Sequence, residues 1–275
     1  MWRVEDGKKL ATLEAEGVHC LAVSNNRRWI AAGTFRGEVF VWDAKTYKKV
    51  IWLTPEDDRS INGVDFSPDS IRLVSASNNG TASIWDTATR ERVQTLDHGY
   101  SLVTAAKYSP QGDRIATATR DSVRVWDSND GRLLVDFKVI VTPSRNTGLL
   151  LLNSHLFVVS GSKIKQIEAS TGSVVSEWPV PDSSRFSSIA LPKHAEFIAY
   201  STQCTVTFWD TATHIQLGFI QHPQDMRSIL VSPDDRFLAI VGDDGKITIN
   251  SLSRISVSIQ SRWIVMHFLF RSFFP

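Results

Sequence analysis

The sequence predicts an all-β protein made from repeats of one small sheet, and three observations support this prediction. Trp-Asp pairs recur, with their tryptophans at Trp42, Trp85, Trp126 and Trp209. Short runs rich in Val, Ile, Thr and Trp lie between them, bounded by Gly, Pro, Asn, Asp and Ser, which is the composition of strands and turns. Ser-Pro segments recur at one place in the pattern. Self-similarity at a fixed period is the signature of a repeat architecture.

The tryptophans define one register along the chain. The first three are 43 and 41 residues apart, and the next follows after 83 residues, about two periods. The period therefore predicts degenerate copies of the Trp-Asp pair, which lie at Trp2, Ile167 and Asn250. Seven positions in one register indicate that nearly the whole chain is built from this unit.

The clearest unit spans residues 96–127. An alternating run over residues 101–108 is followed by a Ser-Pro-Gln-Gly turn, a second run over 113–119 and a third that ends at Trp126 and Asp127. Proline presets φ for a turn, and Gly suits its corner. Such a small sheet cannot bury both of its faces alone, so radial stacking of neighbouring sheets is expected.

With these motifs the chain resembles the WD-repeat β-propeller family, whose units of about 40–45 residues form four-stranded blades. The resemblance covers about residues 2–259. Within the family, the chain is similar to the tandem WD-repeat arrays of fungi. It implies a propeller with six full repeat units and an N-terminal half-unit, interpreted as an incomplete seven-bladed ring. The domain boundaries that follow are residues 1–259 for the propeller and 260–275 for an apolar tail.

The expected strands follow the register in chain order. The half-unit supplies an outer strand at 8–13. The six units follow, at 18–24, 29–33, 38–42 and 48–53; at 61–66, 71–76, 81–85 and 92–96; at 101–108, 113–119, 120–127 and 133–137; at 148–153, 156–160, 163–167 and 173–178; at 186–191, 197–201, 205–209 and 215–220; and at 227–231, 237–241, 246–250 and 255–259.

The ends of the chain leave the closure of the ring open. A seventh unit would need three strands after residue 259, and the tail at 260–275 has the length of one. One interpretation is a truncated or mispredicted fragment of a larger WD-repeat signalling protein. The rival closure has six blades, with residues 8–13 as the outer strand of the last.

Composition excludes several classes of protein. The chain is 42% hydrophobic and 21% charged with a net charge of +1, so it lacks the basic excess of a general nucleic-acid binder. Cys20 and Cys204 are too few for a disulfide framework or a zinc cluster. No signal peptide opens the chain, and the apolar tail is too short for a membrane helix. We expect a cytoplasmic protein, with a nuclear location as the alternative, and no cofactor, metal, nucleic-acid or membrane partner.

The resemblance also implies a buried polar network inside a blade, which links a His, a Ser or Thr, an Asp and the Trp. The third unit matches it best, with His98, Thr117, Asp121 and Trp126. The other units keep parts of it, at Ser75 and Trp85, at Trp42, at Trp209 and at Asp244. Sets of His, Asp and Ser or Thr could be read as a hydrolase triad, but a triad needs one exposed nucleophile in a cleft. Fragments that recur at one repeat position favour a structural role.

By analogy of fold, the resemblance implies a non-enzymatic scaffold that binds proteins or peptides through the loops between blades. Candidate contact positions lie beside the second-to-third hairpins and before the first strands: Phe35, Arg59, Asn78, Tyr100, Arg120, Arg185, Arg227 and Asp243. Tyr and Arg are favoured anchors at interfaces. A propeller-class hydrolase would need convergent acidic, His or metal-binding residues on several blades, and the sequence shows no such set.

Overall fold

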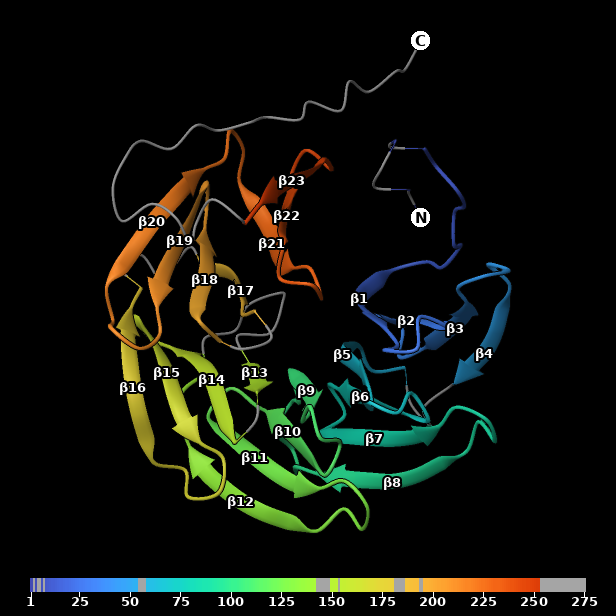
Figure 1. Ribbon diagram of the computed structural model, residues 1–275. Coiled ribbons are helices and arrows are strands. Elements are labelled where there is room, and N and C mark those ends of the chain that lie inside the picture. Colours follow the sequence, from blue (N-terminus) through green and yellow to red (C-terminus); the bar gives the residue numbers. More distant parts are fainter. Residues whose placement is uncertain are drawn as a thin grey trace. The chain divides into compact units, whose positions relative to one another are not determined.

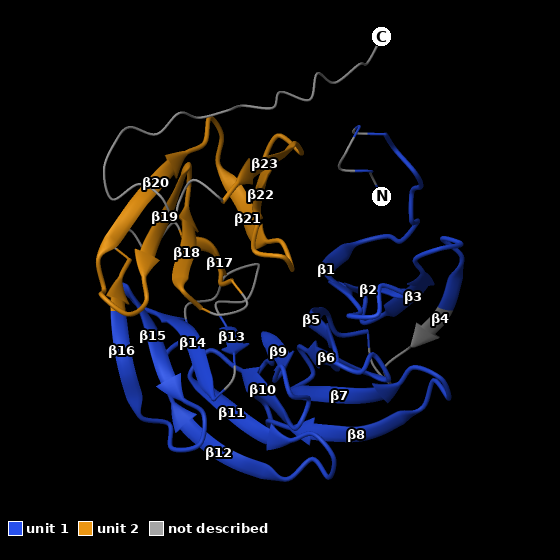
Figure 2. Cartoon of the chain, in the orientation of Figure 1, with its two compact units in different colours: residues 1–143, 147–177 blue, residues 144–146, 178–275 orange. Residues whose placement is uncertain are grey.

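The computed structural model describes residues 1, 3, 6, 8–53, 58–141, 149–152, 154–180, 186–192 and 195–252. These residues form β-strands and no helix (Figure 1). Accordingly, none of them belongs to a helix long and apolar enough to cross a membrane. The all-β class predicted from the repeat is confirmed. The chain divides into two compact units, which are described separately (Figure 2).

The first unit comprises residues 1–143 and 147–177 and holds four antiparallel sheets, here called blades 1 to 4. In each blade the strands pair in chain order. The strands are β1 (Val18–Val23), β2 (Trp29–Thr34), β3 (Val39–Asp43) and β4 (Lys49–Leu53); β5 (Ile61–Phe66), β6 (Arg72–Ser77), β7 (Thr81–Asp86) and β8 (Arg92–Asp97); β9 (Ala105–Tyr108), β10 (Arg114–Ala118), β11 (Ser122–Asp127) and β12 (Leu133–Lys138); and β13 (Leu149–Leu152), β14 (His155–Ser160), β15 (Lys163–Glu168) and β16 (Val174–Pro179).

The second unit comprises residues 144–146 and 178–275 and holds blades 5 and 6. Blade 5 has four strands and blade 6 has three among the described residues. The strands are β17 (Phe186–Ala190), β18 (Phe197–Thr202), β19 (Thr205–Asp210) and β20 (Gln216–Gln221), then β21 (Met226–Val231), β22 (Phe237–Gly242) and β23 (Ile247–Ser251). The strand predicted at 255–259, the tail at 260–275 and Trp2 lie outside the described residues.

The turn residues explain why the strands end where they do. In the Ser-Pro-Asp-Ser turn after β5, Ser67 Oγ donates to Asp69 Oδ1 over 2.5 Å, and Ser70 N donates to the Ser67 carbonyl over 2.8 Å. Ser70 has a φ of 64°, a left-handed conformation that is uncommon outside Gly and here closes the turn. The same Ser-to-Asp bond occurs between Ser232 and Asp234 over 2.6 Å before β22.

The Asp of each Trp-Asp pair holds the turn to the outer strand. Asp86 Oδ1 accepts hydrogen bonds from Ala88 N and Thr89 N, both over 2.8 Å. Asp43 and Asp210 do the same with the two residues that follow at the same spacing. Backbone hydrogen bonds from the third residue on lower the pKa of all three carboxyl groups. The conspicuous pair thus combines a buried ring with a turn-forming carboxylate.

Two predicted strands differ from the structure. The outer strand expected at 8–13 is reduced to one bridged residue, Lys9. The alternating run expected from Ser101 becomes a strand only at Ala105, because residues before it form a loop with the preceding hairpin. A seventh blade is not observed among the described residues.

Candidate partner-binding loops

The buried centre of blade 3 joins three of the four residues predicted to form a network. Trp126 Nε1 donates to Thr117 Oγ1 over 2.7 Å, and His98 Nε2 lies 2.8 Å from the same oxygen. The hydroxyl in turn donates to the Arg124 carbonyl over 3.5 Å. A threonine oxygen with two lone pairs can accept both ring N–H groups in this arrangement. His98 Nδ1 has no hydrogen-bond partner. With the ring proton on Nε2, this atom carries no hydrogen, so no donor is left unsatisfied.

Asp121, the fourth predicted member, lies outside this network. The turn from Thr119 to Ser122 is closed by a bond from Thr119 N to the Ser122 carbonyl over 2.9 Å. Only Arg120 and Asp121 stand between these residues, whereas the equivalent turn of blade 2 has three residues. Asp121 is therefore exposed at the turn, and its carboxylate accepts from Thr119 Oγ1 over 3.4 Å. The prediction that Asp121 belongs to the network with His98, Thr117 and Trp126 is wrong.

The other blades keep less of the network. In blade 2, Trp85 Nε1 donates to Ser75 Oγ over 2.9 Å, as the sequence predicted. In blade 1, Trp42 is buried among Ile30, Ala32 and Phe40, with Ala32 where a hydroxyl would be needed.

In the second unit the hydroxyl is missing or displaced. Trp209 Nε1 in blade 5 is buried without a hydrogen-bond partner. In blade 6, Asp244 bonds Lys246 rather than a His. His222 instead lies 3.4 Å from Thr248, a contact that sequence reasoning missed because the hydroxyl sits on the third strand rather than the second.

These sets do not have the geometry of a hydrolase triad. Thr117 is fully buried and its hydroxyl is engaged by two rings, so no substrate can reach it. Burial also lowers the pKa of His98 to about 4. Among the described residues, no group of three or more His, Cys, Asp or Glu side chains is arranged to hold a metal ion.

The two cysteines have different surroundings, each of which raises the thiol pKa. Burial raises the pKa of Cys20 to about 12, and its Sγ lies 3.6 Å from the Ile61 carbonyl. Cys204 Sγ donates to Asp225 Oδ1 over 3.1 Å, and this hydrogen bond raises its pKa. Both thiols are thus held protonated, the less nucleophilic form.

Tyr100 is presented by a loop whose base is fixed. Its side chain is completely exposed, and that of Leu102 is 53% exposed. His98, buried in the network, donates its backbone N–H to the Gly80 carbonyl over 2.9 Å, and Gly99 N donates to Asp97 Oδ1 over 2.7 Å. Tyr100 was predicted from its place before the first strand, whereas Leu102 was missed because it was assigned to the strand itself.

Gly80 allows this loop to approach the neighbouring hairpin. It has a φ of 89°, and a Cβ there would stand 2.0 Å from the Gly99 carbonyl oxygen. No L side chain fits in that space. The far end of the loop is fixed as well, since Thr104 N donates to the Ala118 carbonyl over 2.8 Å. The loop is therefore held at both ends while Tyr100 and Leu102 face solvent.

Three further predicted positions in the first unit are exposed. Phe35 is 55% exposed and lies over Gly17, with the Arg36 guanidinium 5.7 Å from its ring centre. Arg59 and Arg120 are exposed, and neither forms an ion pair with another described residue. These positions offer one aromatic ring and two guanidinium groups to a partner.

Asn78 has a role inside the molecule. It is half-buried, and its Oδ1 accepts from Asn62 Nδ2 over 2.6 Å. The same Asn62 amide donates to the Val103 carbonyl over 2.8 Å, so the pair ties the loops of blades 2 and 3 together. The sequence could not reveal this contact, because Asn62 and Asn78 meet only through the register of β5 and β6.

In the second unit, Arg227 and Asp243 pair with each other. Arg227 Nε donates to Asp243 Oδ1 over 2.6 Å, and the side chains are 60% and 52% exposed. An exposed pair of this kind contributes little to stability. Each side chain would have to exchange this partner to contact another protein. Arg185, also predicted as a contact position, lies outside the described residues.

Comparison with known proteins places this architecture among repeat proteins. The family model described as nucleolar protein 10-like, N-terminal domain, matches residues 4–159. The chain is 31% identical over 121 residues to the Protein LST8 homolog of Drosophila melanogaster, covering 41% of this chain and 38% of that protein. It is 31% identical over 86 residues to the small ribosomal subunit protein RACK1z of Oryza sativa subsp. japonica, covering 31% and 25%.

A third relative and one solved structure extend the comparison. WD repeat-containing protein 1 of Gallus gallus is 34% identical over 88 residues, covering 31% of this chain and 14% of that protein. The matches therefore span less than two fifths of the length of these relatives. A chain in the crystal structure of the Mitotic Checkpoint Complex superimposes with a TM-score of 0.78 and 17% identity, covering 91% of this chain and 80% of that one.

Proposed function

The chain belongs to the WD-repeat family of nucleolar protein 10-like N-terminal domains, and from this premise we propose that it is a non-enzymatic scaffold that binds other proteins or peptides through its loops. The observation that carries the proposal is the loop of blade 3, where Tyr100 and Leu102 project from a fixed base. Relatives named as WD-repeat proteins support the class of function. The solved neighbour, described as part of a complex, is consistent with protein partners.

The rigidity of this loop is the physical reason for choosing it. An exposed Tyr offers a large contact area with few rotatable bonds, so little entropy is lost when it is immobilised. A loop that is already ordered avoids a further cost on association. The His98 and Thr104 bonds hold the loop before any partner arrives. Tyr100 is therefore proposed as the anchor of the interface.

Two exposed guanidinium groups on other loops of the same unit define the chemistry of the proposed partner. Arg120 lies in the hairpin whose strand accepts the Thr104 N–H, and Arg59 lies before the inner strand of blade 2. Free guanidinium groups bind carboxylates in a bidentate manner. We therefore propose an extended or helical segment that carries an apolar residue beside Asp or Glu. Phe35 extends the apolar part of the surface on blade 1.

A comparison of bound proteins tests this proposal. Proximity labelling with the full chain is carried out beside the variant Tyr100→Ala/Leu102→Ala/Arg120→Ala. A matched control, Val93→Ala/Leu134→Ala, changes exposed residues on the outer strands β8 and β12. We expect at least one protein to be lost by more than tenfold in the loop variant and retained in the control, since truncation of an anchor costs about 2 kcal/mol or more. Identical partner sets for all three proteins would contradict the proposal.

The alternative function, a propeller-class hydrolase, predicts a different experimental result. It requires turnover by the purified chain, with loss of activity on substitution of residues that converge on one cleft. A panel of ester, peptide and phosphoester substrates assayed with and without added divalent metal distinguishes the two functions. Turnover that is proportional to protein concentration and lost in a point variant would displace the scaffold proposal.

We propose a cytoplasmic location, with the nucleus as the alternative. The two free, protonated thiols are compatible with a reducing compartment. Imaging of a fluorescent fusion at native expression, with a nuclear marker, separates the two locations.

A further inference from the structure

The two tight turns of blade 1 form one surface. Because the strands of a blade are antiparallel and pair in chain order, the turn between the first and second strands lies at the same end of the sheet as the turn between the third and fourth. In blade 1 these turns are residues 25–28 and 43–48. They are in contact, since Ala44 N donates to the Arg28 carbonyl over 2.7 Å. We call them the turn surface of blade 1. The loops that lead from one blade to the next, that of Tyr100 among them, lie at the other end of the sheets.

Four cations of the turn surface have no anionic partner in the described part of the chain. They are Arg27, Arg28, Lys45 and Lys48. All four side chains are exposed, and none forms an ion pair with another described residue. Unpaired positive charges on two adjoining turns attract an anionic partner.

The one carboxylate of the turn surface, Asp43, is used by its own turn. Its Oδ1 accepts hydrogen bonds from Thr46 N over 2.7 Å and from Lys45 N and Thr46 Oγ1, each over 3.0 Å. These hydrogen bonds, with a smaller contribution from the charge of Arg28, lower the pKa of Asp43. Asp43 therefore holds the turn together and leaves an excess of positive charge on the surface.

The Arg28 side chain is already oriented. Its Cζ lies over the Trp29 ring, 4.4 Å from the ring centre, and Trp29 itself is half-buried against the core of blade 1. A cation over an aromatic face is held by the ring quadrupole. The N–H groups of a guanidinium lie in its plane, so covering one face leaves them able to bind a carboxylate in a bidentate manner.

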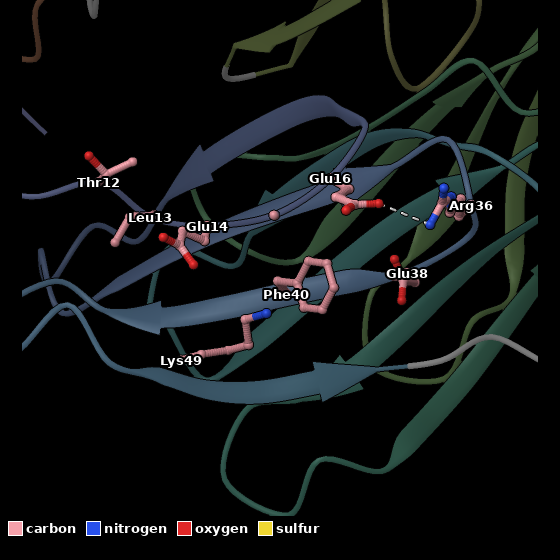
Figure 3. A pocket seen from close by; sticks show the side chains of 9 residues that line it. Thr12, Leu13, Glu14, Glu16, Arg36, Glu38, Phe40 and Lys49 are labelled. Carbon is pink, nitrogen blue, oxygen red and sulfur yellow. Dashed lines mark ion pairs between the residues drawn. The ribbon is translucent and has the colours of Figure 1, made fainter.

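Lys49, the next cation along the chain, is turned toward the middle of the sheet. Its Nζ lies 3.9 Å from the centre of the Phe40 ring, in a hollow that Glu14, Glu16 and Glu38 help to line (Figure 3). Lys49 is therefore not counted among the four cations of the turn surface.

The equivalent turns of blades 2 and 3 have the opposite balance of charge. Those of blade 2, residues 68–71 and 86–91, carry three carboxylates and one cation: Asp69, Asp86, Glu91 and Arg90. Those of blade 3, residues 110–113 and 127–132, also carry three carboxylates and one cation: Asp113, Asp127, Asp130 and Arg132. The positive charge is thus a property of blade 1 and not of the repeat.

The acidic turns of blade 2 begin next to the basic turns of blade 1. Asn26 N donates to Ser70 Oγ over 3.2 Å, and Asn25 Nδ2 donates to the Pro68 carbonyl over 3.3 Å. Asp69 stands between Pro68 and Ser70 in that turn. The excess of positive charge therefore ends where blade 2 begins, which limits the length of an anion that fits the surface.

We propose that the turn surface of blade 1 binds a short acidic segment of another protein, whose Asp or Glu side chains pair with the four cations. Nucleic acids carry charge along their whole length, and a membrane presents a plane of anionic headgroups. Either would extend over the carboxylates of blade 2, whereas a segment with a few acidic residues fits within one blade. This surface and the Tyr100 loop lie at opposite ends of the sheets, so one molecule can hold two partners at once.

Binding of a defined acidic peptide tests the proposal on the full chain. The probe is a short fluorescein-labelled peptide of alternating Glu and Ser, and its counterpart has Gln in place of Glu. Fluorescence anisotropy is measured for the wild-type chain and for the variants Arg27→Gln/Arg28→Gln and Lys45→Gln/Lys48→Gln. A matched control, Arg90→Gln/Arg132→Gln, removes the same charge from exposed positions in the equivalent turns of blades 2 and 3. Circular dichroism verifies that each variant remains folded.

We expect the wild-type chain to bind the Glu peptide and not the Gln peptide, with an affinity that falls as salt is added. Each variant of the turn surface should bind about tenfold more weakly or less, because charge-assisted hydrogen bonds are lost. The control variant should bind like the wild-type chain. No binding of the Glu peptide by the wild-type chain would overturn the proposal, and so would an equal loss in the control, which would mean that only net charge matters.

Two further measurements define the ligand and the surface. A single-stranded oligonucleotide and anionic vesicles are titrated in the same way, and tighter binding of either one through the same four cations would also overturn the proposal. The variant Tyr100→Ala/Leu102→Ala/Arg120→Ala should bind the Glu peptide like the wild-type chain. Its loss of the peptide would assign the acidic ligand to the Tyr100 loop instead, so failure of this inference is separable from failure of the proposed scaffold function.

Discussion

Blades 3 and 5 each have a tryptophan at the equivalent position of their third strand, but the indole N–H is hydrogen-bonded in blade 3 and not in blade 5. In blade 3 the indole N–H and a buried histidine share the Thr117 hydroxyl. In blade 5 the residue at the threonine position is Tyr200, and Trp209 Nε1 is buried without a hydrogen-bond partner. Both sheets nevertheless have four strands in the same order.

The difference shows that a four-stranded blade can form without the hydrogen-bond network. Trp126 and Trp209 each face an aliphatic residue on the second strand, Ile115 and Ile198. Both isoleucines are fully buried. Apolar packing and the carboxylate turn are thus common to the two blades, and the hydroxyl adds stability to one of them. Four predictions, given in order of decreasing effect, concern how much these hydrogen bonds contribute to the free energy of unfolding.

The largest effect is expected from Thr117→Val, which removes the hydroxyl and keeps the shape. Both the Trp126 and the His98 N–H groups then lose their partner inside the blade, and each orphaned donor costs about 2 kcal/mol. The free energy of unfolding in urea should fall by about 4 kcal/mol. The control Thr117→Ser retains the hydroxyl. Equal loss in both variants would show that packing, not the hydrogen bonds, is responsible.

Acidification tests the same site without a substitution. Burial lowers the pKa of His98 from 6.5 to about 4, so the unfolded chain binds this proton more readily than the folded one. Stability from neutral His98 is complete above pH 6.5 and is lost as the pH falls toward 4, by about 3 kcal/mol over that window. Urea midpoints at several pH values measure it. The variant His98→Gln should lack this slope, and an unchanged slope would assign it to other groups.

A smaller loss is expected from Ser75→Ala in blade 2. One indole N–H, that of Trp85, loses its partner, and no histidine is involved. The free energy of unfolding should fall by about 1–2 kcal/mol. A loss equal to that of Thr117→Val would mean that His98 contributes nothing to blade 3.

The smallest difference concerns the tryptophans themselves. Because Trp209 Nε1 has no hydrogen-bond partner, Trp209→Phe removes a buried donor without breaking a hydrogen bond. Trp85→Phe breaks a hydrogen bond and leaves the Ser75 hydroxyl unused. We expect Trp209→Phe to cost about 1 kcal/mol less than Trp85→Phe in thermal or urea unfolding. The reverse order would contradict the comparison of the blades.

Much of this architecture could be predicted from the sequence because its signals are local. The Trp-Asp register and the Ser-Pro-Asp turns located most strands to within about two residues. The errors are also physical. The alternation before Ala105 indicates a strand only where a neighbour is in place to pair with it, and residues 98–104 bond the preceding hairpin instead. Asp121 was assigned by its place in the motif, but a turn one residue shorter carries it away from His98.

The positions of the candidate interface could be predicted from the sequence, but whether each side chain is free to bind a partner could not. Tyr100 and Arg120 are exposed where the repeat places them. Whether a loop residue is available depends on contacts with neighbouring strands and loops, such as the bond between Asn62 and Asn78 within blade 2, and these depend on register rather than composition. The exposure of Leu21 and Val23 could not be inferred from the sequence, because both look like ordinary residues of an inner strand.

The close approach of Gly80 to Gly99 has a consequence for how this surface can diversify. The side chain of Tyr100 is fully exposed and that of Leu102 is 53% exposed, so these positions can change more easily than the base of the loop and can acquire new specificities. Position 80 cannot change in this way, since one added methyl group would stand 2.0 Å from the Gly99 carbonyl and displace the loop from beneath. Selection for a new partner can therefore act on the tip of the loop while its base stays constant, and a substitution at position 80 would alter recognition without contacting any ligand.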